Sequence, residues 1–219
     1  MRLRKQFLTA SMIVGASLAL NARADTYNID PTHSQVLFKV KHLSISTVSG
    51  RFDTFSGTLD MDEGEPKSLK LAGTINAASI NTNNKKRDDH LRNEDFLDVK
   101  SHAEITFETA KTRDRRRGRI RIFGNLKMRG KPRPVVLEGT ISDAVQDPWG
   151  NTRIAVNVEG KIDRTKFGIA WNKEMETGGL VIGEEVTIAL ELEATLVVEE
   201  KTEEVPAEKD EKAAADTKE

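Results

Sequence analysis

The chain has 219 residues, with 34 lysines and arginines against 35 aspartates and glutamates, so its formal net charge at pH 7 is -1. This balance gives no electrostatic reason to expect nucleic acid as a partner. The chain contains no cysteine, which excludes disulfides, thiol catalysis and a cysteine-bound metal. The length suits a single domain that is stabilised by its own core.

The first residues have the features of a secretory signal peptide. A basic segment at positions 1–6 precedes a mostly apolar run from Phe7 to Leu20, and Ala22 and Ala24 are the small residues expected before a cleavage site. The apolar run is shorter than the roughly 20 residues that a membrane-spanning helix needs. We therefore expect residues 1–24 to be removed near Ala24 and the mature protein to be exported to the periplasm.

The middle of the chain alternates between apolar and polar residues in the manner of half-buried β-strands. The first such run, residues 33–42, places His42 on the same face as its apolar residues. A second run, residues 50–62, changes phase near Thr54, which indicates a β-bulge. The alternation returns in six further segments, which are residues 69–77, 105–109, 120–128, 135–141, 154–162 and 186–198.

One segment interrupts this pattern between the third and fourth strands. It is highly charged and ends in the apolar pair Phe96 and Leu97, which predicts a short helical insertion near residues 85–97 that closes one end of the fold. Asp88 and Arg92 are four residues apart, so an ion pair between them would stabilise such a helix.

Eight antiparallel strands joined by short turns predict an all-β fold that closes into a small barrel. The inward-facing residues are apolar, and they include Gly73, Gly124, Gly139 and Gly160. These glycines either leave space inside the barrel or allow its strands to bend. Residues 199–219 are rich in glutamate, lysine and alanine, and we expect them to form a disordered acidic tail.

With these features in place, the chain resembles the YceI-like family of exported, lipocalin-like proteins across residues 25–198. The resemblance is carried by the order and spacing of several motifs, which are Tyr27-Asn28-Ile29-Asp30 with His33-Ser34, Val40-Lys41-His42-Leu43, Gly50-Arg51-Phe52, Arg87-Asp88-Asp89-His90-Leu91 with Asp95-Phe96-Leu97, Gly124-Asn125-Leu126, Asp147-Pro148-Trp149-Gly150, and Asp163-Arg164 through Phe167-Gly168-Ile169. It implies an extended eight-stranded antiparallel barrel whose apolar tunnel holds a long-chain amphiphile of the polyisoprenoid or fatty-acid type. It implies no established catalysis, and we expect no cofactor.

An apolar tunnel with a few polar groups at its mouth suits an amphiphile, because the tunnel takes the tail and the polar groups orient the head. Arg87 and His90 either meet a phosphate or carboxylate head or serve only to cap the barrel. His42 has the same two interpretations. Trp171 is expected in the tunnel and Trp149 in a packed turn. The complete set of predicted ligand-binding residues is Phe38, Val40, His42, Phe52, Arg87, His90, Phe96, Arg164, Phe167 and Trp171.

The leading hypothesis is a periplasmic protein that binds a long-chain lipid or isoprenoid for carriage, storage or stress protection, with a homodimer left open. A hydrolase or isomerase acting through His42 and His90 is the alternative, although the chain lacks a Gly-x-Ser-x-Gly motif. A third reading is a membrane-surface module that uses the basic run from Lys111 to Arg121 to bind anionic lipid weakly. The histidines do not have metal-binding spacing, so no metal site is expected.

Overall fold

The computed structural model describes residues 24–198 apart from residue 116 and residues 176–177. The predicted signal peptide and acidic tail lie outside the described residues. In chain order the elements are β1 (Asp25–Ile29), β2 (Gln35–His42), β3 (Ser46–Phe52), β4 (Phe55–Met61), β5 (Lys70–Asn76), β6 (Ile80–Asn81), α1 (Lys85–Arg92), β7 (Glu104–Asp114), β8 (Arg119–Met128), β9 (Lys131–Ile141), β10 (Val145–Gln146), β11 (Thr152–Asp163) and β12 (Ile182–Leu196), with short 3-10 turns at Pro66–Ser68, Ala77–Ser79 and Arg164–Phe167.

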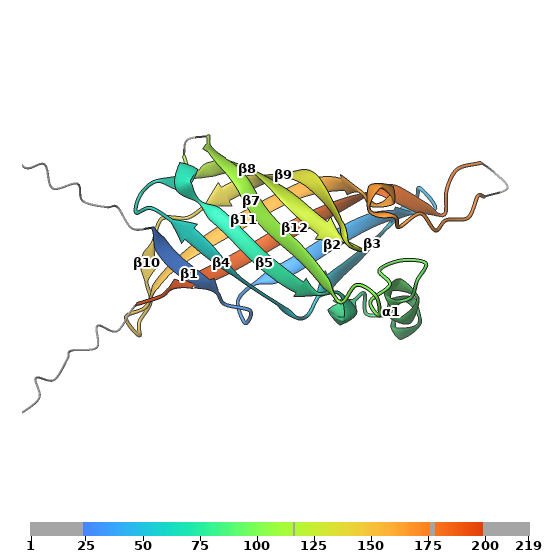
Figure 1. Cartoon of the computed structure of the whole chain (residues 1–219), viewed down its shortest axis with the longest axis horizontal. Helices are drawn as coiled ribbons and strands as arrows, with labels where there is room; N and C mark the ends of the chain where they lie inside the picture. Colours follow the sequence, from blue (N-terminus) through green and yellow to red (C-terminus); the bar gives the residue numbers. More distant parts are fainter. Residues whose placement is uncertain (1–23, 116, 176–177, 199–219) are drawn as a thin grey trace, which may run out of the picture.

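The strands form one closed antiparallel barrel (Figure 1). β1 and β2 pair in turn with one edge of β12, while β11 pairs with its other edge and closes the ring. β2 pairs with β3 and β1 with β4, and β3 pairs in turn with β6 and β4 with β5. The pairs β1 and β2, β3 and β4, and β5 and β6 therefore each occupy one strand position in the barrel. The predicted eight-stranded barrel is therefore confirmed. The β-bulge predicted near Thr54 is wrong, because the chain leaves the sheet there: β3 ends at Phe52, β4 begins at Phe55, and the phase changes across this break.

The barrel interior is solid at the end formed by β1, β4 and the start of β11. Leu59, Val156 and Ala194 there have no exposed surface, and burying a side chain of the size of leucine or valine contributes about 1.5–3 kcal/mol. Towards the other end of β12, the inward-facing Val186 and Ile188 are only half-buried. The interior is therefore packed at one end and hollow at the other.

Gly124 and Gly139 do not create this hollow. A Cβ atom at Gly124 would overlap the ring of Phe107, and one at Gly139 would overlap the backbone carbonyl oxygen of Asn157. Glycine at these positions thus permits the close approach of a ring at Gly124 and of a neighbouring backbone at Gly139.

Helix α1 lies at the hollow end of the barrel, away from β1 and β10 (Figure 1). It begins where the Asn84 side chain accepts a hydrogen bond from the Arg87 backbone N–H at 3.0 Å, an N-cap that satisfies one free donor. It ends at Arg92, and the following turns return the chain so that Phe96 and Leu97 are buried. The predicted helical insertion is confirmed, although the helix itself is shorter than the segment. Among the described residues, no helix combines the length and apolar character needed to cross a membrane.

Candidate functional site

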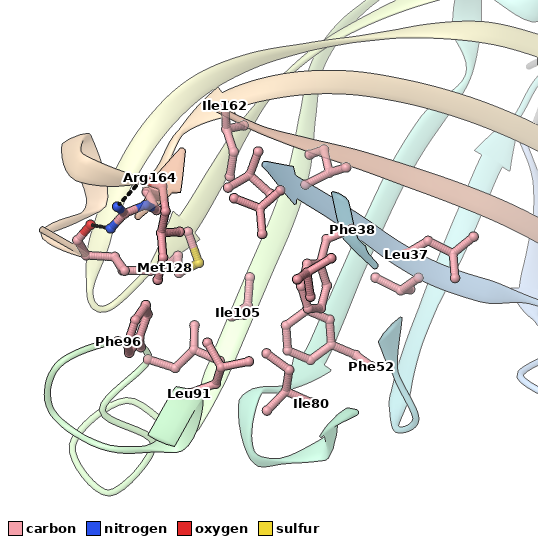
Figure 2. Close-up of a pocket in the computed structure, with 18 of the residues that line it drawn as sticks. Leu37, Phe38, Phe52, Ile80, Leu91, Phe96, Ile105, Met128, Ile162 and Arg164 are labelled. Carbon is pink, nitrogen blue, oxygen red and sulfur yellow. Dashed lines mark hydrogen bonds between the residues drawn. The ribbon is translucent and has the colours of Figure 1, made fainter. Parts of the chain in front are cut away.

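A cavity of about 610 Å³ occupies the hollow half of the barrel beneath α1. Its wall consists mainly of inward-facing side chains from the strands, joined by residues of α1 and of the segment that follows β11 (Figure 2). The aromatic members are Phe38, Phe52, Phe96, Phe107 and Trp171. A volume in this range, with a mostly apolar wall, is typical of a site for a small molecule.

The cavity stops about midway along the barrel. Val36, Leu137 and Leu190 are among its lining residues, whereas β1 and β4 contribute none. Beyond this level the interior is occupied by the fully buried core. The expected tunnel is therefore a cavity that is blind at the packed end of the barrel, with α1 at its other end.

A cluster of three rings joins α1 to the segment after β11. The His90 ring meets Phe96 and Trp171 edge-on, with centroid distances of 4.9 and 5.0 Å, and Phe96 and Trp171 are 5.3 Å apart. His90 Nε2 lies 3.0 Å from the Asp95 carboxylate. Aromatic pairs of this geometry contribute about 0.5–1.5 kcal/mol beyond their buried area. They form a roof over the cavity from two segments that are distant in sequence.

Arg164 holds the second of these segments in place. Its guanidinium donates hydrogen bonds to four backbone carbonyl oxygens, at distances of 2.9 Å to Gly183, 2.6 Å to Ile169, 3.0 Å to Trp171 and 3.3 Å to Ile182. Only 4% of the residue is exposed, and this burial lowers the pKa of the guanidinium. Arg164 thus fixes the loop that carries Trp171 and also forms part of the cavity wall.

The charged residues of α1 tie the helix to the strand before it. Arg87 donates to the side-chain and backbone oxygens of Thr82 at 2.7 and 2.9 Å. The buried Asp88 accepts hydrogen bonds from the backbone N–H and the hydroxyl of the same Thr82. The predicted pair between Asp88 and Arg92 is wrong, because Asp88 turns inward to Thr82 and Arg92 pairs with Asp89 at 3.2 Å instead. These contacts anchor the first turn of α1 to Thr82.

The cavity wall contains all the predicted ligand-binding residues except Phe167. Phe167 is 1% exposed and belongs to the packed core, because the 3-10 turn Arg164–Phe167 directs it away from the cavity. Sequence reasoning did not include Lys41 and Lys86, which also line the cavity. Lys41 lies between Val40 and His42, so strand alternation places it on the other face, and Lys86 directly precedes the Arg87 motif.

Trp149 is not in a packed turn as predicted, since 82% of its surface is exposed. The turn is held instead by the Asp147 carboxylate, which accepts hydrogen bonds from the backbone N–H groups of Trp149 and Asn151 at 3.0 and 2.9 Å. The indole is not needed for the turn, so it lies on the surface.

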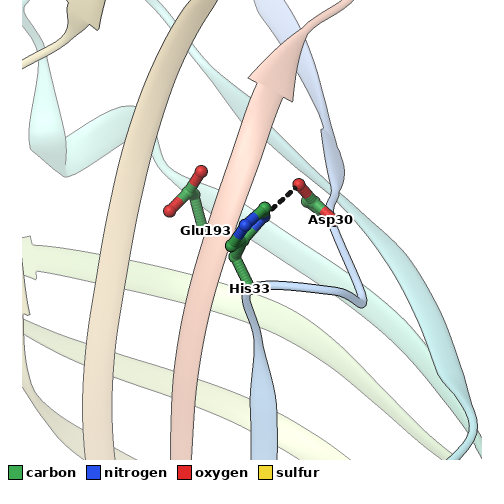
Figure 3. A group of neighbouring side chains, drawn as sticks. All are labelled: Asp30, His33 and Glu193. Atoms are coloured by element: carbon green, nitrogen blue, oxygen red, sulfur yellow. Dashed lines mark hydrogen bonds and ion pairs between the residues drawn. The ribbon is translucent and has the colours of Figure 1, made fainter. Parts of the chain in front are cut away.

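A second polar cluster lies at the packed end of the barrel, where Asp30, His33 and Glu193 bring their ligand-type atoms within 4.8 Å of one another (Figure 3). The Arg153 guanidinium already neutralises this cluster, with Nη1 2.9 Å from Asp30 and 2.7 Å from Glu193. Its Nε lies 2.8 Å from Asp147. A metal ion would have to displace Arg153, so we assign the cluster a structural role.

This cluster predicts a pH dependence of stability. Hydrogen bonds from His33 and Arg153 lower the pKa of Asp30, and those from Asn151 and Arg153 lower the pKa of Asp147. Both carboxylates therefore stabilise the fold above their unfolded-state pKa of about 4, and this contribution is lost as the pH falls. We expect the urea midpoint to decrease between about pH 5 and pH 3.

The variant Arg153→Met should show a weaker decrease over the same range, because carboxylates without their cation repel one another and protonate more readily. The control is Lys161→Met, which removes an exposed ion pair with Glu185 on the outer surface. An unchanged pH slope in Arg153→Met would contradict this assignment.

Comparison with known proteins agrees with this architecture. A family model described as YceI-like domain matches residues 27–194. A UPF0312 protein of Shewanella oneidensis is 34% identical over 171 residues, which cover 76% of this chain and 88% of the relative. One from Vibrio parahaemolyticus is 31% identical over 169 residues, covering 76% of this chain and 89% of the relative.

Solved structures show the same fold. The YceI protein of Campylobacter jejuni has a TM-score of 0.62 and 31% identity, covering 71% of this chain and 88% of its own. BcnA of Burkholderia cenocepacia has a TM-score of 0.64 and 22% identity, covering 76% and 99%. A domain from Saccharophagus degradans, described as polyisoprenoid-binding, has a TM-score of 0.52 and 16% identity, covering 78% and 98%.

Proposed function

We propose that this chain, which belongs to the YceI-like domain family, binds a long-chain amphiphile with the tail inside the blind cavity of its barrel. The observation that carries the proposal is the cavity itself, which measures about 610 Å³ and is lined mainly by aliphatic and aromatic side chains. Such a wall offers little to a polar molecule but favours an alkyl or prenyl chain, at about 0.8 kcal/mol per buried methylene.

The tail is of the polyisoprenoid or fatty-acid type. The described function of the Saccharophagus degradans domain supports the first of these, because that domain shares the fold. The blind end supports a ligand that is inserted tail first, so that its head remains near α1. With the export signal expected at residues 1–24, the protein would carry, store or protect its ligand in the periplasm.

Binding without turnover fits the cavity wall better than catalysis. Among the described residues, the lining includes no serine, threonine, tyrosine, aspartate or glutamate. His42 and His90 therefore have no hydroxyl nucleophile beside them in the cavity, and the triad arrangement of a hydrolase is missing from the wall.

The basic hairpin between β7 and β8 does not favour the membrane-surface alternative. It lies at the packed end, because Asp114 pairs with Ile120 and Ile120 with Gly139 near the closed core. Arg113 is stacked over Phe123 at 5.1 Å, and Arg121 pairs with Glu138. A membrane bound by this hairpin would face away from the cavity mouth.

The test is to purify the exported protein, extract it with organic solvent and identify the extract by mass spectrometry. We expect a long-chain lipid or isoprenoid in amounts approaching one per protein. The extracted protein should then rebind a fluorescent fatty acid in a saturable manner. Recovery of an empty protein that also binds no such ligand would overturn the proposal.

A further inference from the structure

We propose that the ligand's head group is an anion, a carboxylate or a phosphate, and that Lys41, Lys86 and Arg87 bind it at the cavity mouth. This inference rests on the proposed function, since it concerns the head of the same ligand. The supporting observations are the sign of the charges on the wall and the lack of ion pairs at Lys41, Lys86 and Arg87 among the described residues.

All ionisable side chains on the described cavity wall are bases, namely Lys41, His42, Lys86, Arg87, His90 and Arg164. A chain with nearly equal numbers of acidic and basic residues has thus placed one sign alone around an otherwise apolar cavity. A low-dielectric wall lined by one sign of charge concentrates the electrostatic field and attracts ions of the opposite sign.

Within the described part of the chain, only His90 of these six bases has an acidic partner in an ion pair. His90 is paired with Asp95, and Arg164 is held by backbone carbonyls. By contrast, Lys41 and Lys86 form no ion pair with a described residue, and Arg87 donates only to the neutral Thr82. Neighbouring Lys85 shows the difference, because it pairs with Asp89 at 2.7 Å and does not line the cavity.

The unpaired bases come from two sides of the mouth. Lys41 is near the end of β2, whereas Lys86 and Arg87 are in the first turn of α1. An anionic head between these elements would receive charge-assisted hydrogen bonds from ammonium and guanidinium groups, which are stronger than those to a neutral head. An alcohol or quinone head would gain much less from the same groups.

The experiment compares ligands that share a tail and differ in the head. The delipidated protein is titrated calorimetrically with tetradecanoic acid and tetradecan-1-ol, and with geranylgeranyl monophosphate and geranylgeraniol. We expect at least one anion to bind about tenfold more tightly than its alcohol, which corresponds to about 1.4 kcal/mol. The preference should decrease with added salt, because the lysines are exposed. Whether the acid, the monophosphate or both show it identifies the anion.

The double variant Lys41→Gln with Lys86→Gln should reduce the preference to less than threefold, because it weakens binding of the anions far more than binding of the alcohols. The matched control is Lys85→Gln, which removes a neighbouring charge outside the cavity and should keep the full preference. Equal binding of anions and alcohols by the unmodified protein would overturn this inference and leave the proposed function intact. If neither class of ligand binds, the proposed function itself fails.

Discussion

Replacing Val186 with tryptophan is expected to abolish binding of long-chain ligands while the barrel remains folded. Val186 is on β12, faces the cavity and is only half-buried. It is paired with Val40 on one side and Ile162 on the other, so an indole at this position would extend into the space under α1. The tail would then be excluded from the blind end, and we expect affinity to fall at least about 100-fold, or about 2.7 kcal/mol.

The fold should tolerate this change because the new ring enters empty space. Overpacking costs about 1–3 kcal/mol in a filled core, whereas here the added apolar surface is buried without displacing a neighbour. We expect the urea midpoint of the ligand-free protein to stay close to that of the unmodified chain. Binding is measured by titration with a fluorescent fatty acid.

The matched control is Val136→Trp, the same substitution on the outer face of β9, where the valine is 40% exposed. It should bind the fatty acid normally. Retained binding in Val186→Trp would show that the ligand does not occupy this cavity, and loss of binding in both variants would show that the effect is not specific to it.

The barrel and most of its cavity wall were predictable from the sequence because strand alternation assigns each side chain to the inner or outer face. This is why Phe38, Val40 and Phe52 were identified correctly as inward. Alternation carries no information about where along the barrel the interior is filled. The boundary depends on how side chains from opposite strands meet, as at Leu137 and Leu190, and only the three-dimensional packing shows it.

Contacts outside the strands were less predictable, for a related physical reason. Helical spacing allows Asp88 to reach Arg92, but a buried carboxylate is better satisfied by the two donors of Thr82. Phe167 belongs to a turn without periodicity, so nothing in its neighbourhood indicated that it faces the core. In both cases tertiary contacts decided the outcome, and local sequence could not reveal them.

The contacts of Arg164 could not be predicted from its neighbours in sequence either. Its guanidinium holds the loop after β11 in place. The variant Arg164→Met should be strongly destabilised, because the carbonyls of Gly183, Ile169 and Trp171 lose the guanidinium as their donor, while that of Ile182 keeps the Asn172 side-chain amide. A buried acceptor without a partner costs about 1–3 kcal/mol. Allowing for some relaxation and access to water, we expect the free energy of unfolding to fall by about 3–5 kcal/mol.

For a domain of this size the corresponding decrease in melting temperature is roughly 6–20 °C. The control is Arg133→Met, which removes hydrogen bonds to the carbonyls of Lys166 and Pro132 at an exposed position and should cost less than about 0.5 kcal/mol. A loss below about 1 kcal/mol in Arg164→Met would mean that water replaces the guanidinium, contrary to its burial.

Because the loop also carries Trp171, which packs on His90 and Phe96, the variant should bind ligand more weakly even where it remains folded. The loss of stability and the loss of affinity are separated by measuring binding at a temperature at which the variant is still folded. The roof over the cavity depends on the position of the loop, whereas the closure of the barrel does not.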